Sequence, residues 1–168
     1  LLVVTGGVIA QHGPTTDHLV GTGAYGNIEL VSVEEVTTTP GLVADVAVNP
    51  AGTYAFLANW GEPKCALNSE AGGQNNPDAG AWVVDITDLN DPKTVGFIAS
   101  SQDSRPGEGM QVVNITTKQF KGDVLVMNNE QCGKNGKGGV SLWNVTNPLK
   151  PFKLSEHFGD RAQLSRGD

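Results

Sequence analysis

The chain has 168 residues, with 11 basic and 18 acidic side chains that give a formal net charge of −7, and such an acidic balance argues against nucleic acid as a partner. Its 22 glycines and 9 prolines mark many turns, and only 17% of the residues are charged. This composition is typical of an all-β globular protein and excludes a helical bundle or a disordered tail.

The chain opens with an apolar run of ten residues, LLVVTGGVIA, which is too short to span a bilayer. With Val8 and Ala10 as the small residues ahead of Gln11, the run has the pattern of the end of a signal peptide. We therefore expect residues 1–10 to be a truncated signal-peptide remnant, with no transmembrane span and a secreted or cell-surface protein. A buried N-terminal strand is the alternative interpretation.

After a polar, Gly-rich lead-in at residues 11–26, the chain alternates strand and turn patterns. β-Branched and aromatic residues with period-two spacing predict five strands, at Asn27–Val36, Leu42–Asn49, Thr53–Asn59, Ala81–Ile86 and Thr94–Ser100. The segment Trp60–Gly80 between two of these strands is rich in Gly, Pro and Asn and is predicted to be a long loop.

The same order of strands then recurs. The stretch Ala81–Lys93, AWVVDITDLNDPK, returns as Val140–Phe152, VSLWNVTNPLKPF, with Ile86 matching Val145 (145 − 86 = 59). Further strands are predicted at Gly109–Ile115, Asp123–Asn128, Val140–Asn144 and Phe152–Ser155, and DVLVMN at Asp123–Asn128 echoes YAFLAN at Tyr54–Asn59. A four-strand unit that recurs every ~60 residues, without helical periodicity, is typical of propeller blades.

The predicted fold is therefore an all-β β-propeller fragment of about two four-stranded antiparallel blades plus one preceding outer strand. Blade one is expected at about residues 42–100 and blade two at about 106–156, within a propeller segment at 27–168. Because a blade cannot bury both faces alone, further blades are expected from chain outside this sequence.

The segments VVDITDLNDPK, RPGEGMQVV, DVLVMNNEQCG and GGVSLWNVTNPLKP resemble the LVIVD repeat of bacterial secreted β-propellers, over about Asn27 to Asp160. The resemblance implies an exported propeller and no particular reaction.

In a blade whose first strand is innermost, the start of strand one and the end of strand two lie together at one mouth of the central channel. The candidate ligand-binding residues at that mouth come from both blades: Asp45, Asn59, Trp60, Glu62, Arg105, Glu108, Gln111, Asn128, Asn129 and Glu130. Their carboxylate and amide oxygens suit Ca²⁺, a sugar or a peptide. Alternatively, they hydrogen-bond one another and channel water.

Two functional hypotheses follow. The first is a non-enzymatic scaffold that binds a protein, glycan or small ligand on the loop face, with no catalytic residue. The second is an extracellular hydrolase or lyase, possibly assisted by a metal, with Asp45, Glu62, Glu108 and Glu130 at the channel mouth. A purely structural repeat is a third interpretation.

Cys65 and Cys132 lie in the long loops after the second strand of consecutive blades. A disulfide that joins the two blades is geometrically possible there, and two unpaired thiols are the alternative.

Overall fold

The structure is a computed structural model, and it describes residues 24–25, 28–37, 43–61, 79–101, 104–131 and 136–160. Ten strands lie in these ranges: β1 (Ala24–Tyr25), β2 (Ile28–Glu29), β3 (Val43–Val48), β4 (Tyr54–Asn59), β5 (Gly80–Asp85), β6 (Lys93–Ala99), β7 (Ser104–Thr116), β8 (Lys121–Gln131), β9 (Val140–Asn144) and β10 (Phe152–Phe158). Within the described ranges, no helix is long and apolar enough to cross a membrane.

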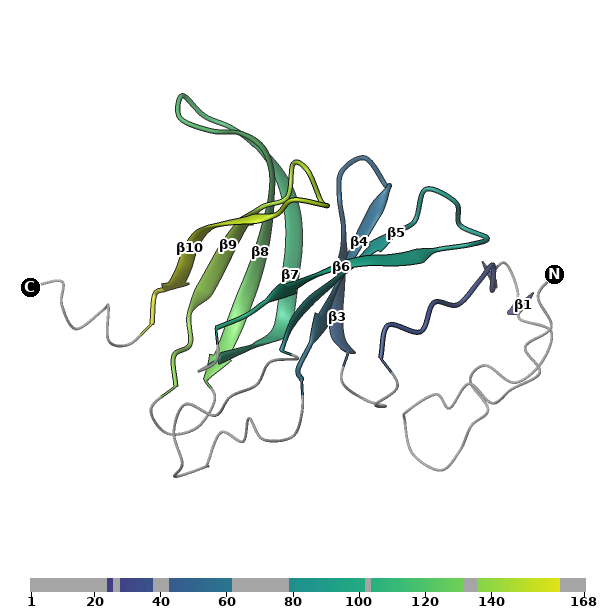
Figure 1. Ribbon diagram of the computed structural model, residues 1–168, viewed down its shortest axis with the longest axis horizontal. Helices are drawn as coiled ribbons and strands as arrows, with labels where there is room; N and C mark the ends of the chain where they lie inside the picture. Colours follow the sequence, from purple (N-terminus) through teal and green to yellow (C-terminus); the bar gives the residue numbers. More distant parts are fainter. Residues whose placement is uncertain are drawn as a thin grey trace, which may run out of the picture.

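The strands form two four-stranded antiparallel sheets, which we name sheet one (β3-β4-β5-β6) and sheet two (β7-β8-β9-β10). In each sheet the strands follow one another in chain order, and the first strands of the two sheets, β3 and β7, lie beside each other (Figure 1). This is the arrangement of two neighbouring propeller blades, so the expected fold class is confirmed. The strands Ala81–Ile86 and Val140–Asn144, which start the repeated unit, lie in separate sheets as predicted.

The turn between the third and fourth strands is built identically in both sheets. In sheet one, Asp85 Oδ1 accepts a hydrogen bond from the Thr87 amide (2.9 Å), and in sheet two Asn144 Oδ1 accepts one from the Thr146 amide (2.9 Å). Asp88 and Asn147 then repeat this contact with the amides two residues later. A short side chain that caps nearby amides is the reason that Asx and Thr residues form such turns.

From the shared turn to Ser155, the hydrogen-bond register aligns the outer halves of the two sheets at one offset, and beyond Ser155 sheet two has a second irregularity that sheet one lacks. Thr94 lies opposite Val84 in sheet one, and Lys153 lies opposite Trp143 in sheet two, so both strands are related by 59 positions (153 − 94 = 59; 143 − 84 = 59). An irregularity follows the pair at this point in both sheets, between β5 and β6 and between β9 and β10.

In the inner halves the offsets differ from those that the sequence comparison predicts. Leu57 pairs with Trp82 in sheet one, and Met127 pairs with Ser141 in sheet two. Because Trp82 and Ser141 are equivalent, Leu57 corresponds to Met127, and β4 and β8 are related by an offset of 70 positions (127 − 57 = 70). The sequence comparison matched Asn59 with Asn128, which is an offset of 69 positions (128 − 59 = 69). The residue equivalent to Asn59 is therefore Asn129. The similarity of YAFLAN and DVLVMN is too short to define a register, because a shift by one residue leaves both segments apolar.

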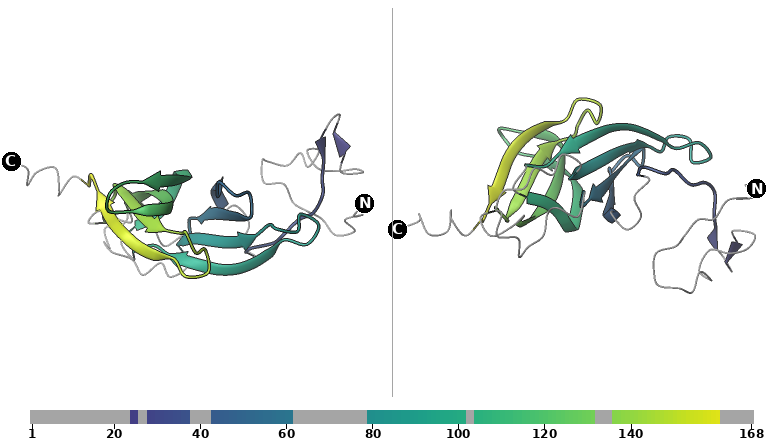
Figure 2. Two further views of the ribbon diagram at one scale, coloured as in Figure 1. Left: turned by 90° about the horizontal axis from the view of Figure 1, so that it is seen from above. Right: turned by 60° about the horizontal axis from the view of Figure 1, so that its bottom comes forward.

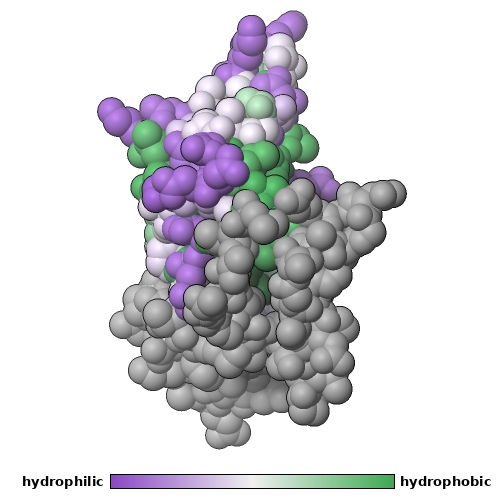
Figure 3. Space-filling view, turned by 90° about the vertical axis from the view of Figure 1, so that its right-hand side faces the viewer, coloured by the Kyte–Doolittle hydropathy of each residue, from purple (hydrophilic) through white to green (hydrophobic). Residues whose placement is uncertain are grey.

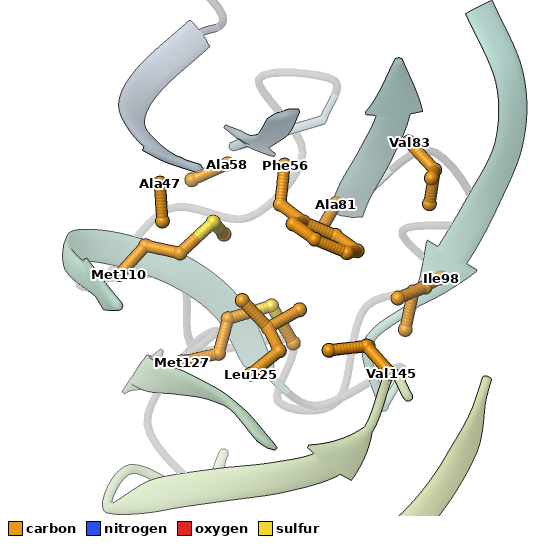
Figure 4. Close-up of a cluster of buried hydrophobic side chains, with 10 residues drawn as sticks. All are labelled: Ala47, Phe56, Ala58, Ala81, Val83, Ile98, Met110, Leu125, Met127 and Val145. Atoms are coloured by element: carbon orange, nitrogen blue, oxygen red, sulfur yellow. The ribbon is translucent and has the colours of Figure 1, made fainter. Parts of the chain in front are cut away.

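One face of sheet one packs against one face of sheet two, and a single hydrophobic core lies between them. Side chains from both sheets that are nearly inaccessible to solvent make up this core, namely Ala47, Phe56, Ala58, Ala81, Val83, Ile98, Met110, Leu125, Met127 and Val145. Figure 4 shows Phe56 of sheet one directed toward Leu125 and Met127 of sheet two. Because side chains alternate along a strand, the residues between these, such as Leu57 and Trp82, lie on the opposite face of sheet one.

The predicted outer strand at Asn27–Val36 is shorter in the structure. Among the described residues 28–36, only Ile28–Glu29 is a strand, and it pairs with Ala24–Tyr25 in a separate two-stranded sheet. The residues after this strand contact sheet one through side-chain hydrogen bonds and not through strand pairing. The Ser32 hydroxyl donates to the Leu89 carbonyl (2.5 Å), and Glu34 accepts hydrogen bonds from the amide and hydroxyl of Thr94. In Figure 2 this segment runs from the small sheet toward sheet one.

Candidate functional site

The candidate residues lie at one rim of the molecule, where β4 and β8 end and β3 and β7 begin (lower edge in Figure 1). The antiparallel order of each sheet places these four strand ends together, because a short turn at the opposite rim joins β3 to β4 and β7 to β8. The connections from β4 to β5 and from β8 to β9 leave from the same rim.

The structure brings three of the predicted residues into direct contact, and we name Trp60, Arg105 and Glu130 the rim site. Arg105 Nη2 lies 2.8 Å from Glu130 Oε2, and Arg105 Nε donates to the same oxygen (2.9 Å). The guanidinium carbon lies 4.9 Å from the centre of the Trp60 ring. Arg105 and Glu130 are paired across β7 and β8 of sheet two, whereas Trp60 follows β4 of sheet one. The rim site therefore spans both sheets.

The Arg105 side chain is 20% exposed and that of Glu130 is 31% exposed. A partly desolvated guanidinium that is paired with a carboxylate and stacked on an indole is held in a defined orientation. Each group nevertheless retains contact with solvent, so a ligand can reach both.

Asp45 lies at the same rim but joins the two sheets through the backbone. Its Oδ2 accepts a hydrogen bond from the Met110 amide on β7 (2.7 Å), and its Oδ1 accepts one from the Val46 amide on β3 (2.8 Å). Both carboxylate oxygens of Asp45 thus have backbone partners, and its position secures β3 against β7.

Next to Asp45, sheet two has an irregularity that no sequence pattern indicated. Pro106 pairs with Asn129 and Met110 with Met127, so Gly107, Glu108 and Gly109 lie opposite the single residue Asn128. The Gly107 amide donates to Asn128 Oδ1 (3.1 Å). A Cβ on Gly107 would lie 2.8 Å from the side chains of Asn128 and Glu130, so glycine is what permits this close approach.

Asn59 and Asn129 occupy equivalent, buried positions at the ends of β4 and β8. Asn59 pairs with Gly80, and the Asn129 amide donates to the carbonyl of the equivalent Gly139 (139 − 80 = 59; 2.7 Å). The Asn129 side chain donates to the Ser141 hydroxyl (2.7 Å). These contacts are internal to each sheet, and their partners are not candidate residues.

Two other described candidates, Glu108 and Gln111, do not join this cluster. Glu108 is exposed in the irregular segment of β7. Gln111 is exposed on the face of sheet two that points away from sheet one, because its neighbours Met110 and Val112 face the core. Glu62, Cys65 and Cys132 lie outside the described residues, so the predicted disulfide stays a prediction, as do the signal-peptide remnant and most of the lead-in segment.

Two of the three described carboxylates of the enzymatic alternative have partners other than a second carboxylate: Asp45 bonds two amides and Glu130 pairs with Arg105. The third, Glu108, is exposed. Among the described residues, no group of three or more acidic, His or Cys side chains is placed to hold a metal ion. Calcium binding stays a prediction that includes Glu62.

His157, which the sequence analysis did not single out, lies at a junction of three segments in the structure. It is buried, its Nδ1 donates to the Gly138 carbonyl (3.0 Å), and its Nε2 lies 2.9 Å from the Ser101 hydroxyl. The 59-residue repeat matches His157 with the core residue Ile98 in the sequence (157 − 98 = 59). In the structure, however, a second irregularity between Ser155 and Phe158 places Phe158 opposite Val140, so the repeat alone does not identify the contacts of His157.

No family model matches the chain, and no curated protein matches it either.

Proposed function

We propose that this chain is part of an exported β-propeller that serves as a binding scaffold, with the rim site as its ligand-contacting surface. The observation that carries the proposal is the cluster of Trp60, Arg105 and Glu130, which the two sheets build jointly. Trp and Arg are the residues most enriched at binding hot spots, and here a planar indole and a guanidinium are held against each other at an accessible rim.

The chemistry of the cluster favours a ligand that carries both hydrogen-bonding groups and an apolar surface, such as a glycan or a peptide. Glu130 accepts hydrogen bonds and Arg105 donates them, while Trp60 offers apolar contact area. The similarity to LVIVD repeats and the apolar N-terminal run support export, which sequencing of the mature N-terminus tests directly, with Gln11 expected as the first residue.

Binding is tested with defined arrays of oligosaccharides and peptides, probed with the unmodified protein and with Arg105→Ala, Glu130→Gln and Trp60→Ala. We expect at least one probe to be retained by the unmodified protein and its affinity to fall about tenfold or more in each variant, as substitutions at hot spots do. The matched control is Glu108→Gln, an exposed carboxylate of the same rim that lies outside the cluster. Retention of no probe, or equal retention by Arg105→Ala, would contradict the proposal.

A further inference from the structure

The contact between His157 and Ser101 has the geometry of a base and a nucleophile. His157 Nε2 lies 2.9 Å from the Ser101 hydroxyl, and His157 Nδ1 lies 3.0 Å from the Gly138 carbonyl oxygen. A carbonyl oxygen only accepts hydrogen bonds, so Nδ1 carries the proton of the neutral imidazole. Nε2 is then the acceptor, and the Ser101 hydroxyl donates to it. In this arrangement a histidine takes up the proton of an attacking serine.

The surroundings of His157 hold its ring in this orientation. His157 is 7% exposed, and Gly138 is itself held, because its amide donates to Asp160 Oδ1 (2.9 Å). Among the described residues other than glycine, His157 alone has a positive φ (55°), and it lies in the irregularity between Ser155 and Phe158. This backbone conformation is uncommon outside glycine, and such outliers concentrate at functional sites.

Ser101 also receives a hydrogen bond from a second serine. Ser104 Oγ lies 3.2 Å from Ser101 Oγ, and Ser104 is fully buried. Because Ser101 donates to His157, the hydroxyl of Ser104 is the donor in the contact between the two serines. A hydroxyl that donates to the nucleophilic oxygen stabilises the negative charge that develops there. Ser101 is only partly buried, so it is the member of this group most open to solvent.

These contacts lie where β6 and β10 end and β7 begins, on the left-hand side of Figure 1. Residues 28–37 lie on the opposite side of the molecule, which Figure 3 shows. There the partly buried Ser32 donates its hydroxyl to the Leu89 carbonyl, which is not a base. Ser32 is therefore a serine of similar burial that lacks the partner that Ser101 has.

We propose that Ser101 and His157 are a nucleophile and base that accept an acyl group from a carboxylic ester. Ser101 Oγ attacks the ester carbonyl carbon and its proton passes to His157 Nε2. His157 returns this proton to the alcohol oxygen as the bond between that oxygen and the carbonyl carbon breaks. The alcohol leaves, and Ser101 carries the acyl group. Water that attacks this acyl group by the same route releases a carboxylic acid and restores the Ser101 hydroxyl.

The probe is a tagged fluorophosphonate, which transfers its phosphonyl group to an activated serine and releases fluoride. Peptide mass spectrometry of the full chain locates the modified residue and follows its rate of modification. We expect Ser101 to react at least about 100-fold faster than Ser32 and Ser155, because a positioned base supplies a gain of about that size. Ser155 is also partly buried, and neither it nor Ser32 forms a hydrogen bond with a histidine among the described residues.

His157→Asn is the matched variant. Asparagine tolerates a positive φ and retains an amide nitrogen that can donate to the Gly138 carbonyl, but it has no counterpart of Nε2. The rate of modification at Ser101 should fall at least about 100-fold in this variant. Ser155→Ala is the control and should leave that rate unchanged, because Ser155 lies two residues from His157 without contacting Ser101.

Three results would overturn the inference: no modification at Ser101, modification of other serines only, or an equal rate at Ser101 in His157→Asn. Thermal melting verifies that each variant is folded. If His157→Asn does not fold, the rates at Ser101 and Ser155 within the unmodified protein decide. The proposed activity goes beyond the binding role. None of the variants alters Trp60, Arg105 or Glu130, so a failure here is distinguishable from a failure of the rim site.

Discussion

Sheet one and sheet two have the same outer half and different inner halves. Next to the turn, their third and fourth strands share one offset and one irregularity, and in both turns the side chain of Asp85 or Asn144 accepts a hydrogen bond from the amide two residues later. Sheet two has a second irregularity farther along β10. Their first and second strands differ, because β3 and β4 have six residues each, whereas β7 has 13 and β8 has 11.

The difference separates architecture from recognition. The repeated outer half consists of the third and fourth strands and the turn between them, and this turn forms through the same side-chain-to-amide hydrogen bonds in both sheets. The rim site and the contact of Asp45 lie entirely on the inner half, where β7 and β8 extend beyond their counterparts and Arg105 and Glu130 are placed on the extension. A binding surface is therefore expected to vary on inner strands while the outer strands stay alike.

The largest expected effect tests whether the two sheets depend on a shared core. Phe56→Ala in sheet one and Leu125→Ala in sheet two each remove a side chain with no solvent exposure. We expect a loss in the free energy of unfolding of about 3–5 kcal/mol for Phe56→Ala and about 2–5 kcal/mol for Leu125→Ala. Urea unfolding monitored by circular dichroism measures both.

In either variant the whole molecule should unfold in one lowered transition, because each side chain packs against the other sheet. A profile in which one transition moves and a second stays at its original denaturant concentration would show that the sheets are independent, contrary to this comparison.

A smaller effect concerns Gly80, the glycine opposite Asn59. A Cβ on Gly80 would collide with the Ile98 carbonyl of the adjacent strand, whereas one on Gly96 would lie 3.7 Å from Val83, an ordinary contact. We expect Gly80→Ala to lower the free energy of unfolding by about 1–3 kcal/mol, as overpacking does. The control Gly96→Ala should change it by less than about 1 kcal/mol. Equal effects in thermal melting would argue against the close approach at Gly80.

The smallest expected effect is a difference in pH response between the two matched turns. Hydrogen bonds from the hydroxyl and amide of Thr87 lower the pKa of Asp85 below its usual value, whereas Asn144 does not titrate. Because the lowered pKa belongs to the folded state, the contribution of Asp85 is present above about pH 4, the usual pKa of Asp, and is lost as the pH falls through the folded-state pKa.

Asp85→Asn copies the turn of sheet two into sheet one and should flatten this part of the acid response. The measurement is the melting temperature between pH 7 and about pH 3, compared with the unmodified protein. Glu34, whose pKa is lowered by its hydrogen bonds from Thr94, keeps its own acid response in both proteins. An identical decline of the melting temperature in both would show that the turn carboxylate contributes nothing.

Much of the fold could be predicted, and the reason is that its signals are local. The Asp85–Thr87 and Asn144–Thr146 contacts span two residues, and alternating apolar residues mark the strands around them. The outer strand at Asn27–Val36 was overpredicted for the same reason, because alternation alone does not supply a partner, and Ser32 and Glu34 bond the β5–β6 region instead.

The candidate site was predicted as a region and not as a set of contacts. Strand order alone placed Trp60, Arg105 and Glu130 at one rim. The hydrogen bond from the Met110 amide to Asp45 joins residues that are 65 positions apart in the sequence. The placement of three residues of β7 opposite Asn128 depends on an irregularity in the pairing of β7 with β8. No local sequence pattern indicates either feature.

Taken by itself, the amino-acid sequence determined the strands, the repeated turn and the succession of two like sheets, because backbone geometry and turn chemistry act over a few neighbouring residues. Only the tertiary structure decided the register of the inner strands, the partners of Asp45 and Arg105, and which face of each sheet is covered. Those features depend on pairings between distant segments, and a shift of one residue along a strand would exchange its two faces.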